Sequence, residues 1–231
     1  MKFLSDLLDL LLPQTCAGCG RPSALLCATC LAFLTGAPAR YVRPNAELSR
    51  CWAVASYQGP VRAVIVAHKE HGRTPLAAPL GTALAKAIKT AVPSDEQCAV
   101  VWIPSSHRSI RARGHDPTRR MAAAAVDELR RAGTPVTALQ ALRHRREVAD
   151  QASLSAVQRA ANLAGALEPS PNVPLSGRRV VLVDDVITTG ATLTEGARAL
   201  RTAGARILAA ATVAATPTHQ EKTKPPTRHP P

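Results

Sequence analysis

From residue 51 onwards, short apolar segments alternate with longer segments in which apolar residues recur at helical spacing. The runs AVVWIP (99–104) and RVVLVDD (179–185) are short, apolar and bounded by turn signals, which is typical of buried strands. The predicted strands are 51–57, 99–104, 136–139, 179–185 and 206–214, and the predicted helices are 61–69, 76–91, 119–132, 155–164 and 192–203. Strands that alternate with helices predict an α/β domain with a mainly parallel sheet, which we assign to residues 49–216.

The two ends of the chain have a different pattern. Leucines at positions 4, 7, 8 and 11 share one helix face, and two aspartates interrupt the apolar stretch. We therefore predict a docking helix over 1–12 rather than an export signal, and a cytoplasmic protein. No apolar run reaches the roughly 18–20 residues that a membrane span needs. The tail 217–231 is rich in proline and polar residues, so we expect it to be disordered.

Charge and composition narrow the range of partners. The chain has 29 Lys and Arg against 16 Asp and Glu, a net charge of +13, which favours phosphates, nucleic acid or another acidic partner. Genomic composition alone would also explain this excess. Aromatic residues make up only 3% of the chain, too few to line a long groove that stacks single-stranded bases.

Two Cys-x2-Cys pairs lie close together near the N-terminus, at Cys16, Cys19, Cys27 and Cys30. Two such turns complete a closed tetrahedral site, which predicts structural Zn²⁺ rather than a catalytic metal. Two disulfides or four unrelated buried thiols are the alternatives, but disulfides are unusual in a chain without an export signal. We assign residues 1–48 to a helix and a small zinc ribbon, and expect the rest of the chain to stay folded without the metal because its core is separate.

The segment VVLVDDVITTGATL (180–193) combines a buried strand, two carboxylates, a loop of small and hydroxyl residues, and a helix. Backbone N–H groups at such a helix N-terminus bind anions, and the carboxylates suit hydroxyls or a divalent ion. Phosphate and vicinal hydroxyls together describe a ribose 5-phosphate. The Gly-Lys-Thr/Ser ending of a P-loop and the dinucleotide-binding glycine pattern are both absent. The alternative is a plain strand–turn–helix in which Thr192 only caps the helix.

This segment resembles the phosphoribosyl-diphosphate (PRPP) binding motif of type I phosphoribosyltransferases. The resemblance implies a type I phosphoribosyltransferase-like fold and Mg²⁺ bound together with PRPP. It implies that Asp184 and Asp185 hold the ribose hydroxyls. The residues implied to hold the 5-phosphate are Thr188, Thr189, Gly190, Ala191 and Thr192.

Together with the four-cysteine ribbon, the chain resembles the ComF family of competence-associated proteins over roughly residues 14–215. Three further segments carry the resemblance: 56–73, 102–116 and 145–162. It implies a diphosphate loop after the 99–104 strand, with Ser105, Ser106 and Arg108 as candidate ligands. The alternative is that Arg108, Arg111 and Arg113 form a solvated basic helix face. The chain departs from the family where Arg113-Gly114 is followed by His115-Asp116-Pro117 instead of an aromatic residue, Asn and Gln.

Two functions remain open at this stage. One is a phosphoribosyltransferase that acts on an unidentified base or amine, for which the sequence names no catalytic residue. The other is a protein of DNA uptake or processing that keeps the PRPP loop as a sensor or relic and binds single-stranded DNA or DNA-processing proteins. The arginines expected to cluster in such a DNA surface are Arg111, Arg113, Arg119, Arg120, Arg130 and Arg131.

Overall fold

The computed structural model describes residues 15–22, 25–42, 48, 50–92, 96–146 and 162–217. The helix predicted over 1–12, most of the helix predicted over 155–164 and the tail after residue 217 lie outside these residues.

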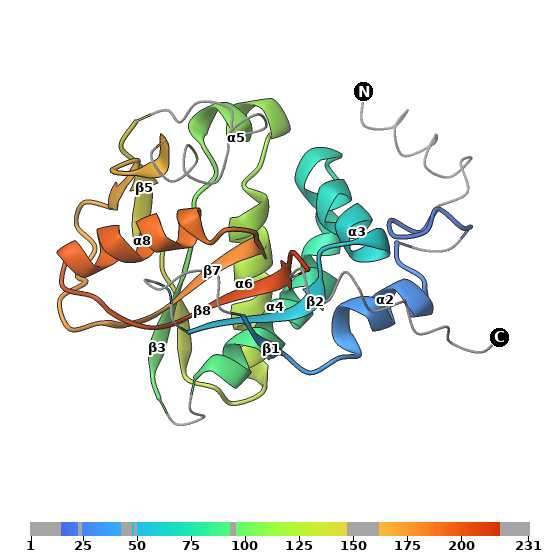
Figure 1. Ribbon diagram of the computed structural model, residues 1–231, viewed down its shortest axis with the longest axis horizontal. Coiled ribbons are helices and arrows are strands. Elements are labelled where there is room, and N and C mark those ends of the chain that lie inside the picture. The colour runs from blue at the N-terminus through green and yellow to red at the C-terminus, as the bar shows by residue number, and fades with distance from the viewer. Residues whose placement is uncertain are drawn as a thin grey trace.

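A six-stranded sheet forms the centre of the molecule, in the order β1-β2-β8-β7-β3-β4 (Figure 1). All neighbouring strands are parallel except β1, which pairs with β2 in the antiparallel direction. The strands are β1 (Arg40–Val42), β2 (Cys51–Ser56), β3 (Cys98–Trp102), β4 (Val136–Ala138), β7 (Arg179–Ile187) and β8 (Arg206–Ala215). The predicted mainly parallel α/β fold is thus confirmed. A second, antiparallel sheet of β5 (Leu142–His144) and β6 (Leu167–Pro169) was not predicted.

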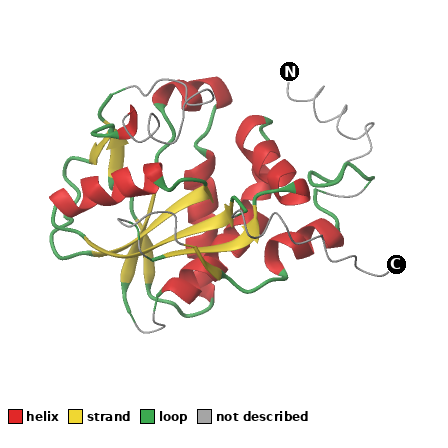
Figure 2. Ribbon diagram, in the orientation of Figure 1, coloured by secondary structure: helices red, strands yellow, loops and turns green. Residues whose placement is uncertain are grey.

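Helices cover both faces of the large sheet (Figure 2). Helices α4 and α6 pack on one face, and α8 packs on the other, together with the small sheet. The helices are α2 (Ala28–Thr35), α3 (Gly59–Glu70), the 3₁₀ turn η1 (Thr74–Leu76), α4 (Ala77–Ala91), α5 (His107–Arg113), α6 (Pro117–Arg131) and α8 (Ala191–Thr202). The predictions for α3, α4, α6 and α8 are confirmed, whereas α2 and α5 were not predicted. No helix of the described part has the length and apolar character needed to cross a membrane.

Successive residues of β7 point alternately to the two faces. Val181 and Val183 join the core under α4 and α6, whereas Val180 and Leu182 join the core under α8. This period of two follows from the pleat of a strand. The alternation ends at the carboxyl end of β7, where Val186 packs against the core under α4 and α6 and Ile187 joins the core under α8.

The small side chains of this core let the helices approach closely. A Cβ on Gly81 of α4 would lie 2.5 Å from the Cβ of Ala124 and 2.9 Å from the backbone N of Ala125, both in α6. Real Cβ atoms do not make contacts this short, so glycine is needed where α4 and α6 touch. Close helix packing therefore fills a core that has few aromatic side chains.

The cysteine-containing segment shares its core with the α/β domain. Helix α2 contacts α3, α4 and β2, and Leu34 is fully buried in the same cluster as their side chains. The Lys86 side chain of α4 donates a hydrogen bond of 2.7 Å to the Thr35 carbonyl. The prediction of a separate core is therefore wrong, because α2 is apolar enough to pack into the main domain.

Candidate functional site

A pocket of about 280 Å³ opens beyond the carboxyl ends of β3 and β7. Its lining brings together Ser105, Ser106, Asp184 and Thr192, four of the residues singled out in the sequence. The carboxyl edge of a parallel sheet is where ligands of open α/β folds bind. The structure thus places parts of both predicted loops around one cavity.

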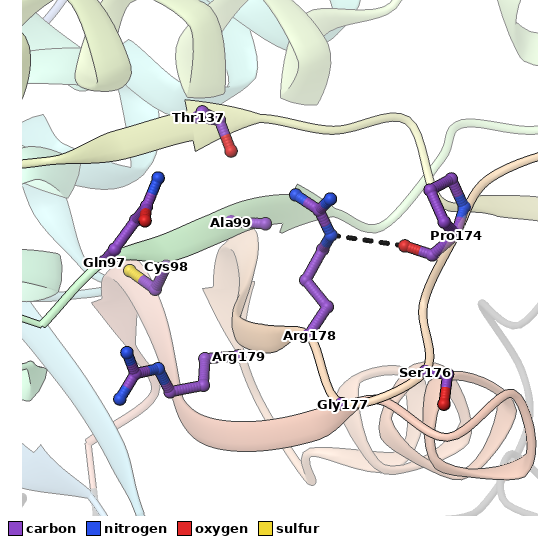
Figure 3. A pocket seen from close by; sticks show the side chains of 9 residues that line it. All are labelled: Gln97, Cys98, Ala99, Thr137, Pro174, Ser176, Gly177, Arg178 and Arg179. Atoms are coloured by element: carbon purple, nitrogen blue, oxygen red, sulfur yellow. Dashed lines mark hydrogen bonds between the residues drawn. The ribbon is translucent and has the colours of Figure 1, made fainter.

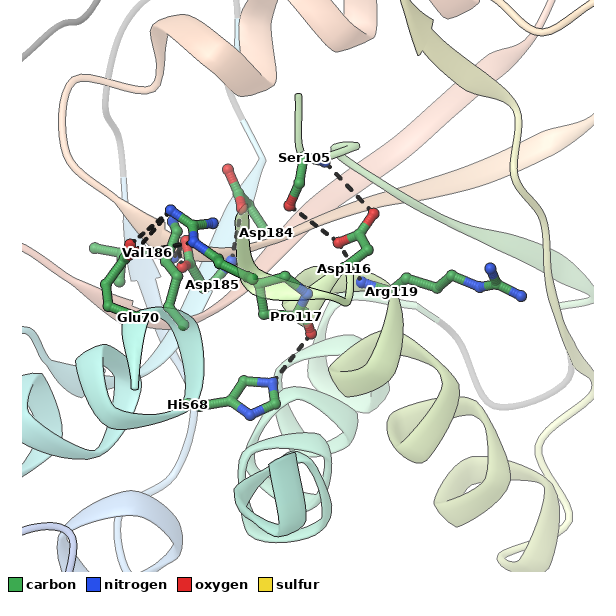
Figure 4. A network of polar contacts seen from close by, with 11 residues as sticks. His68, Glu70, Ser105, Asp116, Pro117, Arg119, Asp184, Asp185 and Val186 are labelled. Atoms are coloured by element: carbon green, nitrogen blue, oxygen red, sulfur yellow. Dashed lines mark hydrogen bonds and ion pairs between the residues drawn. The ribbon is translucent and has the colours of Figure 1, made fainter. Parts of the chain in front are cut away.

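The two aspartates of β7 have different surroundings (Figure 4). Both are half-buried within the strand, because β7 continues beyond them to Ile187. Asp184 lines the pocket and accepts a 2.8 Å hydrogen bond from the backbone N–H of Asp185. Asp185 points to the α3 side of the sheet and forms a 2.7 Å ion pair with Lys69. The alternation along β7 accounts for this division.

Asp184, Asp185 and Lys69 bring two carboxyl groups together with a single ammonium group. Burial, and then the neighbouring charge of Asp185, raise the pKa of Asp184 well above its usual range. Burial alone would lower the pKa of Lys69, but the carboxylates of Asp185 and Asp184 outweigh it and raise the Lys69 pKa. Among the described residues, Asp184 has no ion-pair partner of its own. Its carboxylate is therefore suited to a divalent cation or to hydroxyl donors, which would supply the missing compensation.

The loop after β7 turns into α8 through a left-handed glycine. Gly190 has φ of 76° and is the N-cap of α8, and the backbone N–H of Ala191 donates a long hydrogen bond of 3.4 Å to Thr189 Oγ1. A residue with a Cβ would be strained there. Thr192, in the first turn, lines the pocket beside Asp184. Thr188 is exposed and Thr189 half-buried, so the predicted phosphate loop presents one face to the pocket and another to solvent.

The loop after β3 differs in part from expectation. Ser105 donates to the Asp116 carboxylate (Oγ to Oδ1, 3.1 Å), and Ser106 caps α5 by accepting from the backbone N–H of Ser109 at 3.1 Å. Arg108 lies exposed on α5 and does not line the pocket. Arg113 does line it, and its guanidinium pairs with Glu70 at 2.8 Å. Arg113 lines the pocket in place of Arg108 because both lie on α5, a helix that was not predicted. This helix places Arg108 on an exposed side and Arg113 at the pocket.

Two further pocket residues were missed as site candidates. Lys69 lies in the segment 56–73 that carried part of the ComF resemblance, which was the signal available for it. His144 comes from β5; its Nε2 is 2.9 Å from the Pro104 carbonyl and therefore carries the hydrogen. That leaves Nδ1 as a lone-pair acceptor, buried and without a partner in the described part of the chain. No sequence pattern indicated that His144 would reach the pocket.

The four predicted metal-ligating cysteines lie together. The Sγ atoms of Cys16, Cys19, Cys27 and Cys30 are all within 4.8 Å of one another, and Cys19 and Cys27 are 3.8 Å apart. Tetrahedral bonds of about 2.3 Å to a central ion separate sulfurs by about 3.8 Å. A Cβ on Gly18 would lie 2.7 Å from the Cys30 Sγ, so the turn needs glycine. The cluster can hold a metal ion.

Backbone donors favour a thiolate in this cluster. The N–H groups of Gly18 and Cys27 lie 3.4 and 3.3 Å from the Cys16 Sγ. Burial would raise the pKa of the Cys16 thiol, but backbone donors outweigh it and lower that pKa to about 6. By contrast, burial raises the pKa of Cys51 to about 12.

The arginines of α6 form two groups. Arg119 and Arg120 are exposed in its first turn, and Arg130 and Arg131 lie in its last. Eleven residues of helix separate Arg119 from Arg130 by about 16 Å. Arg130 donates to the Val136 carbonyl at 2.9 Å and Arg131 pairs with Glu128 at 2.8 Å. The candidate arginines of α6 therefore lie on the predicted helix after β3, at its two ends.

Another cavity, of about 370 Å³, lies at the opposite, amino edge of the sheet (Figure 3). Arg178 and Thr137 point into it, while Arg179 points away and pairs with Glu96 at 2.9 Å. None of the residues predicted from the sequence lines this cavity. It is not the candidate site.

Comparison with known proteins agrees with this geometry. Residues 119–230 match the phosphoribosyl transferase domain family. The matched residues include β7, α8 and the loop between them, which carry Asp184, Asp185 and Thr192.

Curated relatives share a short segment with the chain. It is 51% identical over 45 residues to the adenine phosphoribosyltransferase of Mycobacterium avium (strain 104), and 55% identical over 45 residues to that of Mycobacteroides abscessus. These matches cover 20% of the chain, which spans about a quarter of the length of these relatives (25%).

Among solved structures, the allosteric regulatory enzyme of purine biosynthesis is similar over 80% of this chain and 30% of its own, at 19% identity and a TM-score of 0.33. Orotate phosphoribosyltransferase from Aeropyrum pernix is similar over 78% of this chain and 73% of its own, at 16% identity and a TM-score of 0.32.

Proposed function

We propose that this chain binds PRPP in the pocket at the carboxyl edge of β3 and β7. The observation that supports this most is the convergence of Asp184, Thr192 and Ser105 on one cavity from three separate elements. The N-terminus of α8, which begins after Gly190, would donate backbone N–H groups to the 5-phosphate. Asp184 and Asp185 would accept hydrogen bonds from the ribose hydroxyls, and the loop of Ser105 and Ser106 would donate to the diphosphate.

Mg²⁺ fits this arrangement because Asp184 lacks a cation of its own among the described residues. Carboxylate and phosphate oxygens are the ligands that this hard cation prefers. When bound, it would neutralise the diphosphate of PRPP. Lys69 would keep the charge of Asp185 balanced, while Arg113 would add positive charge at the pocket wall.

Isothermal titration calorimetry with PRPP, with and without Mg²⁺, tests this proposal. Thr192→Val should weaken PRPP binding by about tenfold, because it removes a hydroxyl from the pocket without changing the size of the side chain. Thr82→Val, at an exposed position of α4, is the matched control and should bind as the wild type does. If the wild type binds no PRPP in the presence of Mg²⁺, the proposal fails.

Transfer of the phosphoribosyl group to a base or amine is a second candidate, favoured by His144. Its Nδ1 lone pair is buried at the pocket without a described partner. In this reaction an acceptor nitrogen bonds to the anomeric carbon, the bond to diphosphate breaks, and diphosphate leaves with the electron pair. The acceptor's proton would pass to Nδ1. Release of diphosphate from PRPP plus a panel of bases, lost in His144→Gln, would establish this activity; no release with any base would rule against it.

For the cysteine cluster we propose Zn²⁺, since four thiolates at tetrahedral spacing suit that ion.

We also propose a ComF-type role in DNA uptake or processing, for which the sequence resemblance and the exposed pair Arg119 and Arg120 are the support. A gel shift with single-stranded DNA at two salt concentrations tests it. Binding through phosphates should weaken with salt, with a slope of about −0.7 per phosphate neutralised. No shift at low salt would remove the DNA-binding part of this proposal.

A further inference from the structure

A third cavity lies at the junction of α5 and α6, with a volume of about 510 Å³. Its polar lining comes from His115, Asp116, Arg119, Arg120 and Gln140, and none of its lining residues lines the PRPP pocket. Ligand pockets of proteins span about 300–1,000 Å³, so this cavity is large enough for a small molecule.

The rim of the cavity carries unpaired positive charge. The guanidinium groups of Arg119 and Arg120 form no ion pair or hydrogen bond with the residues that the structure describes. The one carboxylate of the lining, Asp116, accepts hydrogen bonds from Ser105 Oγ (3.1 Å) and from the backbone N–H of Arg119 (3.2 Å). Two adjacent free guanidiniums favour a phosphate, which they can bind with several parallel hydrogen bonds.

A buried acceptor without a partner lies in the same lining. His115 is only 8% exposed, and its Nδ1 is 3.0 Å from the Arg113 carbonyl, so Nδ1 carries the hydrogen. Nε2 is then a lone-pair acceptor, and it has no partner among the described residues. The nearby ring of His68 does not supply one, because its two nitrogens face the carbonyls of Arg73 and Pro117. Buried polar groups are nearly always hydrogen-bonded, so the Nε2 of His115 calls for a donor other than the residues that the structure describes.

We infer that this cavity binds a nucleoside monophosphate, either free or as one unit of a single strand. Its phosphate would bind Arg119 and Arg120, and an N–H or O–H of the nucleoside would donate to His115 or bond to the Gln140 amide. Ile110 and Ala123, which also line the cavity, would contact the apolar face of the base. This site goes beyond the proposed PRPP pocket and does not depend on it.

The two cavities are connected through one carboxylate. Asp116 lines the cavity at the junction of α5 and α6. Its carboxylate accepts a hydrogen bond from Ser105, which lines the PRPP pocket (Figure 4). A phosphate on Arg119 would sit at the helix turn that Asp116 caps. Occupancy of one cavity should therefore change the affinity of the other, and by the same factor in both directions.

Calorimetric titration of the full chain with AMP, adenosine and oligodeoxyadenylate tests the inference. AMP should bind and adenosine should not, because adenosine lacks the phosphate. R119A/R120A should weaken AMP binding at least tenfold. R130A/R131A, which removes the same charge from the other end of α6, is the matched control and should change it less than twofold. His115→Phe should also weaken binding, since it removes the acceptor and keeps a ring.

Stronger binding of the oligonucleotide than of AMP, with the same dependence on Arg119 and Arg120, would identify a single strand as the source of the nucleotide. The inference is overturned if neither phosphorylated probe binds, or if R119A/R120A binds AMP as the wild type does. If AMP binding depends on these arginines while PRPP does not bind the wild type, the inference stands and the proposed PRPP site fails.

Discussion

Replacing Asp184 by asparagine should stabilise the free protein and weaken its binding of PRPP. Asp184 is a half-buried carboxylate that has one backbone hydrogen bond of 2.8 Å and no cation of its own among the described residues. Asparagine keeps the shape and the Oδ1 acceptor but removes the charge. A charged group that loses water without full compensation costs about 1–3 kcal/mol, so we expect a gain of about 1–2 kcal/mol.

The neighbouring substitution should have the opposite sign. Asp185→Asn removes the partner of Lys69 from a 2.7 Å ion pair whose side chains are 37% and 14% exposed. Losing one partner of a buried pair costs about 3–5 kcal/mol and of an exposed pair under about 1 kcal/mol. Because Lys69 is more than one-third exposed, we expect a loss of about 1–2 kcal/mol. Two isosteric changes at adjacent residues should thus move stability in opposite directions.

The pH dependence follows from the raised pKa of Asp184. A group whose pKa is higher in the folded than in the unfolded state stabilises the fold below its unfolded pKa, about 3.9 for Asp. That stabilisation is lost as the pH rises through the folded pKa. The advantage of Asp184→Asn should therefore be small near about pH 4 and should grow as the pH rises through the raised folded pKa of Asp184.

Differential scanning calorimetry at several pH values, with and without PRPP and Mg²⁺, provides the measurement. Each kcal/mol should shift the Tm by about 2–4 °C for a chain of this size. Ligand should raise the Tm of the wild type more than that of Asp184→Asn, since a ligand stabilises only the state it binds. The reasoning is refuted if Asp184→Asn and Asp185→Asn lower the Tm equally, or if the effect of Asp184→Asn does not change with pH.

Three other substitutions test separate features. Cys30→Ser should lower both bound metal, measured by mass spectrometry, and the Tm, because α2 packs into the main core; Cys98→Ala should leave metal content unchanged. Gly190→Val should lower stability by about 1–2 kcal/mol, because its φ is 76°, and should also weaken PRPP binding. Gly133→Val is the control: its φ is 78° and it lies away from the pocket, so it should lower stability by the same amount and leave PRPP affinity unchanged. Gly81→Ala should lower stability by about 1–3 kcal/mol in urea unfolding, and an unchanged midpoint would contradict the close contact of α4 and α6.

The strands and long helices could be predicted because their apolar patterns are local. Helix α5 escaped prediction because none of its residues is fully buried, so His107–Arg113 has no apolar stripe. Its end signals were nevertheless present in the sequence, namely Ser106 as N-cap and Gly114 with a left-handed backbone at the C-cap. The sheet of β5 and β6 has three residues in each strand, too few for a recognisable alternation.

Within the candidate site, the residue types could be predicted better than their surroundings. A period of two already implies that Asp184 and Asp185 face opposite sides of the sheet. The partner of Asp185 could not be predicted from spacing, because Lys69 is 116 residues away. The same holds for Leu34, whose burial depends on α3, α4 and β2 coming together around α2. The partner of Asp185 and the burial of Leu34 therefore depend on contacts between residues far apart in the sequence, which local patterns do not predict.

The strand order has a consequence for how the chain folds during synthesis. Strand β8 lies between β2 and β7, and its pairing joins Cys51 to Ala210, residues at nearly opposite ends of the sequence. Contacts of such large sequence separation slow folding. Until β8 leaves the ribosome, β2 and β7 each present an unpaired apolar edge of the kind that chaperones protect from aggregation. The sheet can therefore close only after synthesis has passed residue 215, and a chain truncated before residue 206 would be left with two sheet fragments and nothing to join them.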